Sequence, residues 1–359
     1  MPIIEVNHFT TRRLQILDPS GVVDEQLMPD LGDEALVGLL CSMLRMRTFD
    51  EKALNLQRQG RIGTFGSLRG QEAAQAGLTL NLIDEDWLVP SIREQGVLEG
   101  RGLPMHLYYS FCKGDERASQ IPDGLNATPQ SIPIASQLLH AAGLGMALKL
   151  RNEEAAAVGF AGDGATSEGD FHEALNFAGV FGAQTLFYIQ NNGWAISVPF
   201  SQQTAAETIA QKAFAYGFEG MQVDGNDVLA VYVASRDALD HVRSGKGPYL
   251  IEALTYRMES HTTADDHTRY RPAAEVEAWR ARDPISRMRT FLSRQGLWDE
   301  QQEAELVAKV SAEVEAEVEA LEAMPRPPAT DIFDYMFAEL PATLIEQRQQ
   351  LIAESRNGK

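Results

Sequence analysis

Two short apolar runs separated by a helical pattern stand at the centre of this chain. Residues 155–161 and 185–189 each have the length and composition of a buried parallel strand. Between them, from residue 167 to about residue 182, apolar side chains recur at three- and four-residue steps, a spacing typical of an amphipathic helix. The pattern therefore predicts a strand–helix–strand unit, whose crossover should be right-handed.

Similar runs continue this alternation on both sides of the unit. Strands that alternate with helices predict an α/β fold, in which a parallel sheet is flanked by helices. Asp33 is expected to cap the first of these helices. The predicted strands are residues 86–90, 220–223 and 249–254, and the predicted helices are residues 33–59, 71–80, 134–149 and 228–242.

The two ends of the chain differ from the central pattern. Residues 1–30 contain several prolines and no periodicity, so we expect an irregular arm. Residues 301–324 carry apolar side chains at helical steps in an acidic background, and the prolines that follow should end this helix. We therefore expect an N-terminal arm (1–32), an α/β domain (33–272) and a C-terminal helical extension (273–359).

Composition narrows the classes of function. With 359 residues and 44% hydrophobic side chains, the chain can bury a full core. Its net charge of −20 argues against nucleic acid or an anionic membrane as a partner. No apolar run has the length of a membrane span and the N-terminus lacks a signal-peptide pattern, so we expect a cytoplasmic protein. Cys41 and Cys112, which are far apart, are expected to be reduced.

Residues that could bind a ligand follow the predicted ends of the two central strands. Asp163, between Gly162 and Gly164, follows the first strand, and Asn192 follows the second. Ligands of parallel sheets bind at the carboxyl ends of the strands, so this acid and this amide should be neighbours. Their oxygens suit Mg²⁺ or Ca²⁺, and the glycines and the following helix N-terminus suit an anion. Each motif alone is common, but together they predict a metal-bridged diphosphate.

The sequence of this region resembles that of a known family. GDG followed later by NN is the thiamine-diphosphate motif, and GDGATSEGDFHEALNFAGVF with QNNGWAIS is similar to the alpha subunit of the first component of 2-oxo acid dehydrogenase complexes, in their two-chain form. The resemblance covers residues 40–347. It implies a thiamine-diphosphate-binding fold, thiamine diphosphate and Mg²⁺ as cofactors, and oxidative decarboxylation of a small 2-oxo acid.

The same resemblance implies two protein partners. One is a beta subunit, with which the chain would form an α₂β₂ heterotetramer. In the family, the glutamate that activates the pyrimidine ring of the cofactor lies on that beta chain. The other partner is a lipoylated dihydrolipoyl acyltransferase, whose lipoyl group would be reductively acylated.

The resemblance also assigns roles at the metal–diphosphate end of the site. Asp163, Asn192 and the backbone carbonyl of Trp194 correspond to the metal ligands, with Gln190 as a weaker candidate beside them. Gly164 and Ala165, after Gly162, would donate backbone N–H groups to phosphate. Arg93 would hold the diphosphate, since a guanidinium can bind two phosphate oxygens. Ile92 stands where the family has a tyrosine, so this chain lacks that side chain for any contact with the cofactor.

Further residues correspond to the ring end of the cofactor. Ile134 would bend the cofactor into its V shape, and backbone groups of Ile132 and Ile134 would contact the pyrimidine. His261 matches the histidine that stabilises intermediates and assists acyl transfer, for which its titration range is suited. Its neighbours within residues 267–271, namely His267, Tyr270 and Arg271, are expected to order the loop.

Several alternatives remain open at this stage. Pyruvate is the favoured substrate, but parts of the sequence look equally like branched-chain enzymes, which act on 3-methyl-2-oxobutanoate. An acetoin-cleaving or transketolase-like enzyme would share GDG and NN without the same lipoyl partner. A non-catalytic nucleotide-binding module is the alternative from another class, and the pair Asn191-Asn192 argues against it.

Overall fold

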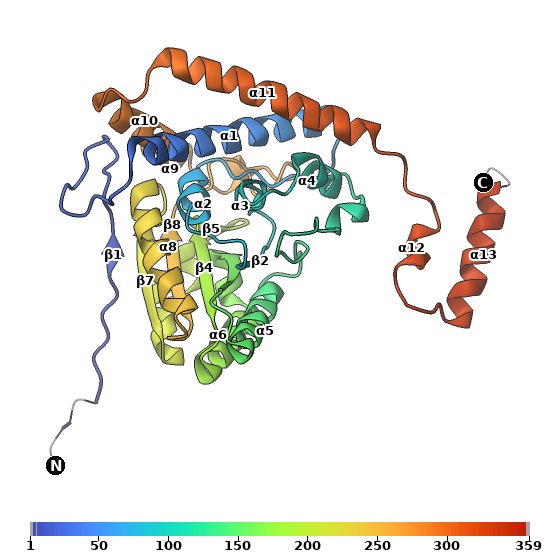
Figure 1. Ribbon diagram of the computed structural model, residues 1–359, viewed down its shortest axis with the longest axis horizontal. Helices are drawn as coiled ribbons and strands as arrows, with labels where there is room; N and C mark the ends of the chain where they lie inside the picture. Colours follow the sequence, from blue (N-terminus) through green and yellow to red (C-terminus); the bar gives the residue numbers. More distant parts are fainter. Residues whose placement is uncertain (1–2, 5, 357–359) are drawn as a thin grey trace. The chain divides into compact units, whose positions relative to one another are not determined.

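The computed structural model describes residues 3–4 and 6–356, and the chain forms two units, residues 1–317 and residues 318–359. The larger unit is built on a parallel six-stranded sheet with the strand order β1-β7-β8-β4-β3-β2 (Figure 1). Its strands are β1 (Arg13–Leu14), β2 (Trp87–Val89), β3 (Ala157–Gly162), β4 (Thr185–Asn191), β7 (Glu219–Asp224) and β8 (Tyr249–Leu254). A separate antiparallel ribbon consists of β5 (Trp194–Ala195) and β6 (Val198–Pro199).

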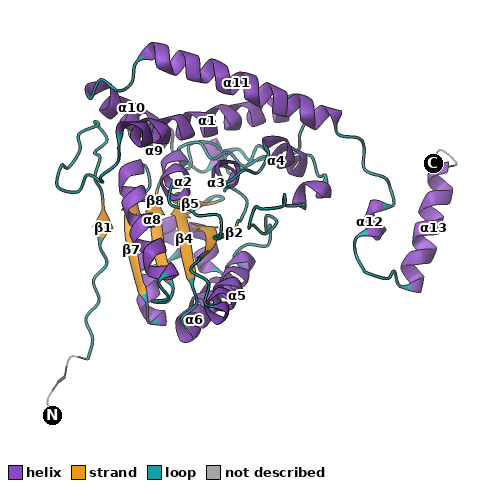
Figure 2. Cartoon of the chain, viewed as in Figure 1, coloured by secondary structure: helices purple, strands orange, loops and turns teal. Residues whose placement is uncertain are grey.

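Helices follow the strands along the chain and cover the sheet (Figure 2). In the larger unit they are α1 (Asp33–Arg58), α2 (Glu72–Thr79), α3 (Gln95–Gly100), α4 (Met105–Cys112), α5 (Ser136–Arg151), α6 (Gly169–Phe181), α7 (Phe200–Gln203), α8 (Val228–Arg243), α9 (Ala273–Arg280) and α10 (Pro284–Arg294). The 3₁₀ helices are η1 (Glu116–Ser119), η2 (Asp163–Ser167), η3 (Ala210–Tyr216) and η4 (His267–Arg269). Helix α11 (Glu300–Ala323) begins in this unit.

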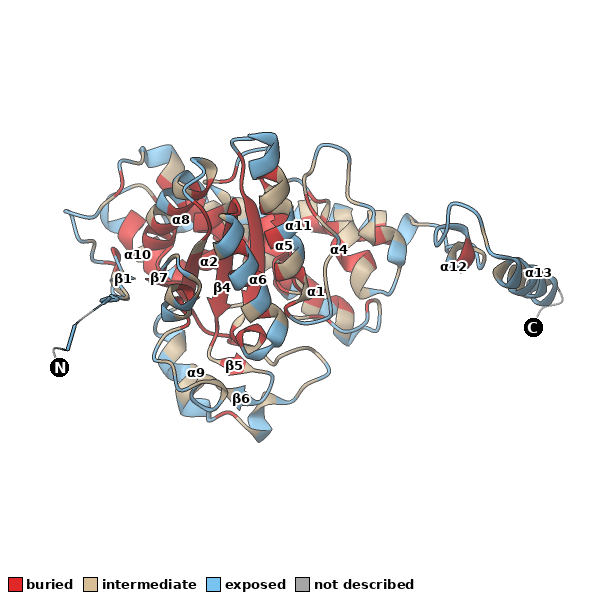
Figure 3. Ribbon diagram, turned by 90° about the horizontal axis from the view of Figure 1, so that it is seen from below, coloured by how far each residue is buried: buried red, intermediate tan, exposed pale blue. Residues whose placement is uncertain are grey.

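The side chains of the central strands alternate between two hydrophobic clusters. Leu186 and Tyr188 of β4 join a cluster with residues of α1, α2, α8 and α10, whereas Phe187 and Ile189 join a second cluster with residues of α5 and α6. Neighbouring strand residues point to opposite faces, so the sheet is covered on both sides. Strand β4 is buried along its whole length (Figure 3). This double coverage explains the continuous apolar runs of the sequence and confirms the predicted α/β class.

The predicted strand–helix–strand unit is present as β3, η2, α6 and β4. Strands β3 and β4 are neighbours in the sheet and end at the same edge. The structure differs from the prediction in one detail, because the 3₁₀ turn η2 follows β3 directly. Glu168 is extended, and the regular helix begins only at Gly169.

Two details of the N-terminal region differ from the expectations, although most of residues 6–32 is irregular as predicted. The arm is not irregular throughout, because β1 pairs with β7 and the carboxylate of Asp227 accepts hydrogen bonds at 2.6 Å from the backbone N–H groups of Ile16 and Leu17. A strand of two residues has no period to detect, and its partner lies far along the chain. Asp33 is the first helical residue of α1 rather than its cap, a position that the extended Gly32 occupies.

The smaller unit contains the last residues of α11 together with α12 (Asp331–Asp334) and α13 (Ala342–Arg356). Within it, Phe333 is buried, whereas Ile332, Tyr335 and Met336 are exposed. The domain boundary predicted at residue 273 stays a prediction. Among the described residues, no helix is long and apolar enough to cross a membrane.

Candidate functional site

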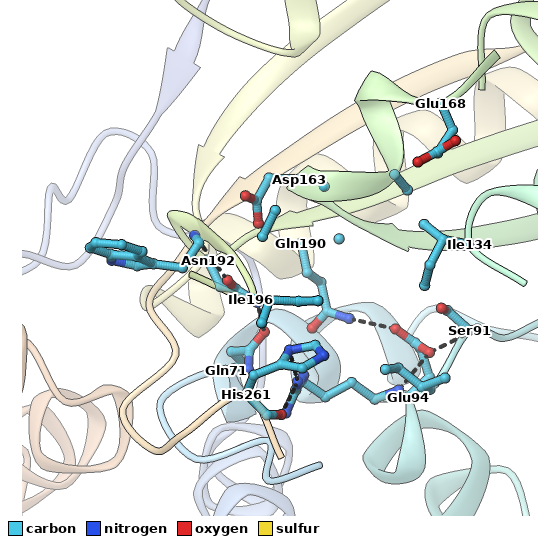
Figure 4. Close-up of a pocket in the computed structure, with 17 residues that line it drawn as sticks. Gln71, Ser91, Glu94, Ile134, Asp163, Glu168, Gln190, Asn192, Ile196 and His261 are labelled. Atoms are coloured by element: carbon cyan, nitrogen blue, oxygen red, sulfur yellow. Dashed lines mark hydrogen bonds between the residues drawn. The ribbon is translucent and has the colours of Figure 1, made fainter. Parts of the chain in front are cut away.

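A cavity of about 240 Å³ opens at the carboxyl edge of the sheet, where β3 and β4 end (Figure 4). Its walls come from the segments that follow β2, β3, β4 and β8 and from the start of α2. The structure thus brings together residues that are far apart in the sequence. The predicted site residues that line the cavity are Arg93, Ile134, Gly162, Asp163, Gly164, Ala165, Asn192, Trp194 and His261.

Asp163 and Asn192 occupy the positions expected from the strand ends. Asp163 is the first residue of η2 and is buried, and one of its carboxylate oxygens accepts a hydrogen bond of 2.6 Å from Nε2 of Gln203. Burial raises the pKa of Asp163, and the bond from Gln203 opposes this rise. The amide of Asn192 donates to Gln71 at 3.4 Å and accepts from the backbone N–H of Trp194 at 3.3 Å.

The turn of η2 lies close to the β5–β6 ribbon. A Cβ atom added to Gly164 would come within 2.8 Å of the Cβ atom of Ala195, closer than real Cβ atoms approach. Only glycine therefore allows the backbone of this turn to lie against the ribbon without a shift. Ala165, which follows, is buried.

Arg93 is buried and held by backbone carbonyl groups. Its guanidinium donates to the carbonyl of Ser67 and, at 2.8 Å, to the carbonyl of His261. The group also lies against the backbone of Gly66, where an added Cβ atom would come within 3.3 Å of it. Burial lowers the pKa of Arg93 from its ordinary value. The side chain is thus fixed in one orientation beside the cavity.

His261 lies between two guanidinium groups. Its Nδ1 atom is 3.5 Å from Nη2 of Arg93 and 3.4 Å from Nη1 of Arg257, and its backbone N–H donates to Asp265 at 2.9 Å. Guanidinium groups only donate, so Nδ1 must accept and the ring proton is on Nε2. Burial, together with the two arginines, lowers the pKa of His261 to about 4. At neutral pH the imidazole is therefore an uncharged hydrogen-bond donor.

Comparison with known proteins identifies the family to which this chain belongs. The family described as "Dehydrogenase E1 component" matches residues 41–330 of the chain. This chain belongs to the dehydrogenase E1 component family. Curated relatives from Staphylococcus aureus and Staphylococcus epidermidis, both named "Pyruvate dehydrogenase E1 component subunit alpha", are 43% identical to it over 336 residues, which is 93% of this chain and 91% of theirs. The family predicted from the GDG and NN motifs is confirmed.

Arg257 is a cavity neighbour of this E1 chain that sequence analysis missed. Its guanidinium donates to the carbonyl of Trp194 at 3.2 Å, to the carbonyl of Ile196 at 2.7 Å and to the hydroxyl of Tyr270 at 3.1 Å. Burial and the nearby Arg93 lower its pKa to about 10. In the sequence, Arg257 stands in a polar and charged stretch, residues 256–272, and such a stretch does not single out one arginine.

Three further buried polar side chains of the E1 chain, Gln71, Glu94 and Gln190, line the cavity. Glu94 accepts hydrogen bonds from the backbone N–H groups of Ser91 at 2.9 Å and Arg93 at 3.1 Å, and from the amide of Gln190 at 3.1 Å. Gln71, at the start of α2, bonds to Asn192. Gln190 was a weak candidate, whereas Gln71 and Glu94 were missed because nothing in their local sequence marks them.

The two predicted ring-contact residues differ in position. Ile134 lines the cavity and is 46% exposed, whereas Ile132 is 57% exposed and does not line it. Ile92, which replaces the family tyrosine, is part of the wall. The contact predicted for the backbone of Ile132 stays a prediction.

The loop after β8 is tied by its own polar side chains. The guanidinium of Arg271 donates to the carbonyl groups of Arg257, Met258 and Glu259. His267 bonds to Ser260 through Nδ1 at 2.7 Å, and the hydroxyl of Tyr270 donates to Asp265 at 2.5 Å. These contacts hold the segment that presents His261.

The candidate metal ligands are of mixed chemical type. No group of three His, Cys, Asp or Glu side chains that could hold a metal occurs within the described part of the chain. The donors near Asp163 are instead one carboxylate, the amide oxygen of Asn192 and the carbonyl oxygen of Trp194. This donor set suits a hard cation that keeps several ligands from water or substrate.

Proposed function

We propose that this E1 chain is the alpha subunit of a two-chain pyruvate dehydrogenase, which decarboxylates pyruvate and reductively acetylates a lipoyl group of a partner acyltransferase. The observation that carries the proposal is the convergence of Asp163, Asn192, Arg93 and His261 on one cavity in a chain of this family. The names of the relatives support pyruvate as the substrate.

The cavity residues fit Mg²⁺ and thiamine diphosphate. A carboxylate has about four acceptor positions and a carbonyl two, so Asp163 and Trp194 keep free lone pairs beside their bonds from Gln203 and Arg257. Nε2 of Gln71 is buried with no hydrogen-bond partner among the described residues, and a phosphate oxygen would satisfy it. Arg93 would bind the diphosphate as a fixed donor.

The remaining walls fit the rest of the cofactor. The backbone N–H groups of Gly164 and Ala165 would bind phosphate oxygens, and Ile134 would press against the face between the rings. When bound, thiamine diphosphate supplies the electron sink for decarboxylation. Arg93 and Arg257 place two positive charges beside His261, which suits an anionic 2-oxo acid at this end of the cavity, although the chain as a whole is acidic.

His261 would act as a hydrogen-bond donor toward the substrate oxygen. Because its pKa is lowered to about 4, the imidazole is neutral at neutral pH and its Nε2–H group is available. The site would be completed by the beta chain, which carries the pyrimidine-activating glutamate in this family. An active enzyme therefore needs both chains.

Calorimetric titration tests the cofactor part of the proposal. Thiamine diphosphate is titrated, with and without Mg²⁺, into the chain co-purified with its beta partner and into the Asp163→Ala variant. We expect binding that requires Mg²⁺ and that weakens about 10–100-fold or more in the variant. Asp237→Ala, which removes an exposed carboxylate of α8, is the matched control and should bind normally. Metal-independent binding of ATP or NAD instead would favour a nucleotide-binding module.

Turnover assays test the substrate. The α–β pair is given pyruvate or 3-methyl-2-oxobutanoate together with a lipoylated acyltransferase domain, and reductive acylation is measured. We expect pyruvate to be strongly preferred. A preference for the branched acid would refute the substrate assignment, and carbon–carbon cleavage of acetoin without a lipoyl acceptor would refute the proposed reaction.

A further inference from the structure

The turn formed by residues 65–70 holds two site segments without lining the cavity. The carbonyl of Ser67 accepts a hydrogen bond from the guanidinium of Arg93, which also donates to the carbonyl of His261 at 2.8 Å. The backbone of Phe65 exchanges two bonds with Thr263: the Thr263 N–H donates to the Phe65 carbonyl at 2.9 Å, and the Phe65 N–H donates to the Thr263 hydroxyl at 3.0 Å. The 65–70 turn thus supports both the arginine and the histidine loop.

Asp50 of α1 anchors this turn from the protein interior. Its carboxylate is fully buried, and one oxygen accepts from the Ser67 hydroxyl at 2.5 Å while the other accepts from the backbone N–H of Leu68 at 2.8 Å. A single carboxylate therefore fixes the residue whose carbonyl holds Arg93. An apolar side chain in its place would leave two buried donors without partners.

The far end of the 65–70 turn has a separate anchor. The backbone N–H of Gly70 donates to the carboxylate of Glu72 at 2.9 Å, and Glu72 is itself paired with Arg47. Loss of the Asp50 bonds would consequently loosen the middle of the turn, where Ser67 lies, while its end stays attached to α2.

We infer that Asp50 is a positioning residue, which acts through Ser67 on Arg93 and thereby sets the affinity of the cavity for the diphosphate of the cofactor. The inference rests on the proposed function, because it concerns the cofactor of that site. Burial raises the pKa of Asp50 to about 7, and the hydrogen bonds from Ser67 and Leu68 oppose that rise because they favour the charged carboxylate.

The test compares two buried aspartates that receive the same substitution. Asp50→Asn keeps the size of the side chain but can accept with only one oxygen. Asp86→Asn is the control, since Asp86 is also buried and accepts backbone N–H groups of Ile83 and Ala156 at 3.0 and 2.9 Å, but it precedes β2 at the end away from Arg93. Dissociation constants for thiamine diphosphate with Mg²⁺ and melting temperatures are measured on the co-purified α–β enzyme.

We expect Asp50→Asn to weaken cofactor binding about tenfold, and Asp86→Asn to leave it unchanged even if the melting temperature falls equally. Measuring Asp50→Asn in an enzyme that also carries Arg93→Lys tests whether the effect on cofactor binding depends on the guanidinium group of Arg93. The lysine side chain keeps a charge and measurable binding but cannot bridge the same carbonyl groups, so Asp50→Asn should then add less than about twofold.

The outcomes separate this inference from the proposed function. No cofactor binding by the unmodified enzyme would remove the proposed function itself. Normal binding by the unmodified enzyme with equal affinity in Asp50→Asn would overturn the inference, as would an equal loss in both backgrounds. If Asp50→Asn does not fold, Ser67→Ala takes its place, because it removes the hydroxyl and leaves the carbonyl. A several-fold loss of affinity is expected for it, and unchanged affinity contradicts the role of Asp50.

Discussion

At the scale of single residues, the surroundings of His261 decide its chemistry. Two guanidinium groups face Nδ1, and most of the ring is buried. Both effects disfavour the imidazolium, and both leave the Nε2 proton in place. A histidine identified from its loop position alone would be taken for a proton acceptor near neutral pH. The structure makes it a neutral donor instead, and under the proposed function this donor would stabilise an oxyanion without proton transfer.

The neutral state of His261 predicts that this histidine titrates at a lower pH than an ordinary histidine. In the NMR spectrum of the α–β enzyme, His261 should titrate with a midpoint near pH 4, and Arg257→Gln should raise that midpoint because a repelling charge is removed. The folded-state pKa lies below the ordinary value of 6.5, so the stability from neutral His261 is complete above pH 6.5 and is lost as the pH falls through 4. Arg236→Gln, on the exposed face of α8, is the control, and a midpoint near 6.5 in the unmodified enzyme contradicts the argument.

At the scale of elements, the contact between α5 and the start of β4 depends on one glycine. A Cβ atom added to Gly145 would lie 2.1 Å from Oγ1 of Thr185 and 2.9 Å from the backbone of Gln184. The carbonyl of Gly145 also accepts from the N–H of Gln184 at 3.1 Å. The helix therefore touches the sheet backbone directly. Gly143, two residues earlier on the same helix, has nothing within 4 Å of such a Cβ atom.

The two glycines give opposite predictions for one substitution. Gly145→Ala should lower the free energy of unfolding by about 1–3 kcal/mol, because the helix must shift from the strand. Gly143→Ala should raise it by about 0.5–1 kcal/mol, because alanine favours the helix. Urea unfolding of the purified chain measures both values. Equal effects of the two substitutions would mean that α5 does not approach β4 as closely as described.

The helices and strands were easier to predict from the sequence than the residues that hold the site residues in place. The strand at residues 249–254 agrees with β8, and Asp163 and Asn192 lie where the ends of the apolar runs indicated. Such features depend on local periodicity. Arg257, Gln203 and Asp50 act on residues that are 61, 40 and 17 positions away, respectively, and only the folded chain brings these pairs together. The family resemblance supplied Arg93 and Ile134, for which the local sequence gave little evidence.

At the scale of the whole molecule, the rim of the cavity exposes apolar side chains. Ile134 and Ile196 line the cavity and are 46% and 54% exposed. Apolar side chains exposed beside a cavity are typical of surfaces that another chain covers. They are consistent with the proposal that the active site is shared with a beta subunit.

A site shared with a beta chain, as proposed, predicts that neither chain works alone. The purified alpha chain should show less than about a hundredth of the decarboxylation rate of the α–β mixture, because the pyrimidine-activating glutamate is absent. Size-exclusion chromatography with light scattering should give the mass of two alpha and two beta chains for the mixture. Full turnover by the alpha chain alone would contradict the proposed arrangement.

The pairing of β1 with β7 also bears on how the chain is made. Ile16, next to this short strand, is bonded to Asp227, 211 residues later. A ribosome must therefore synthesise more than half of the protein before the first strand can find its neighbour. Until then the leading segment has no place in the sheet, and closing so long a loop costs entropy that only late contacts repay. The segment that contains β1 therefore cannot join the sheet before β7 has been synthesised.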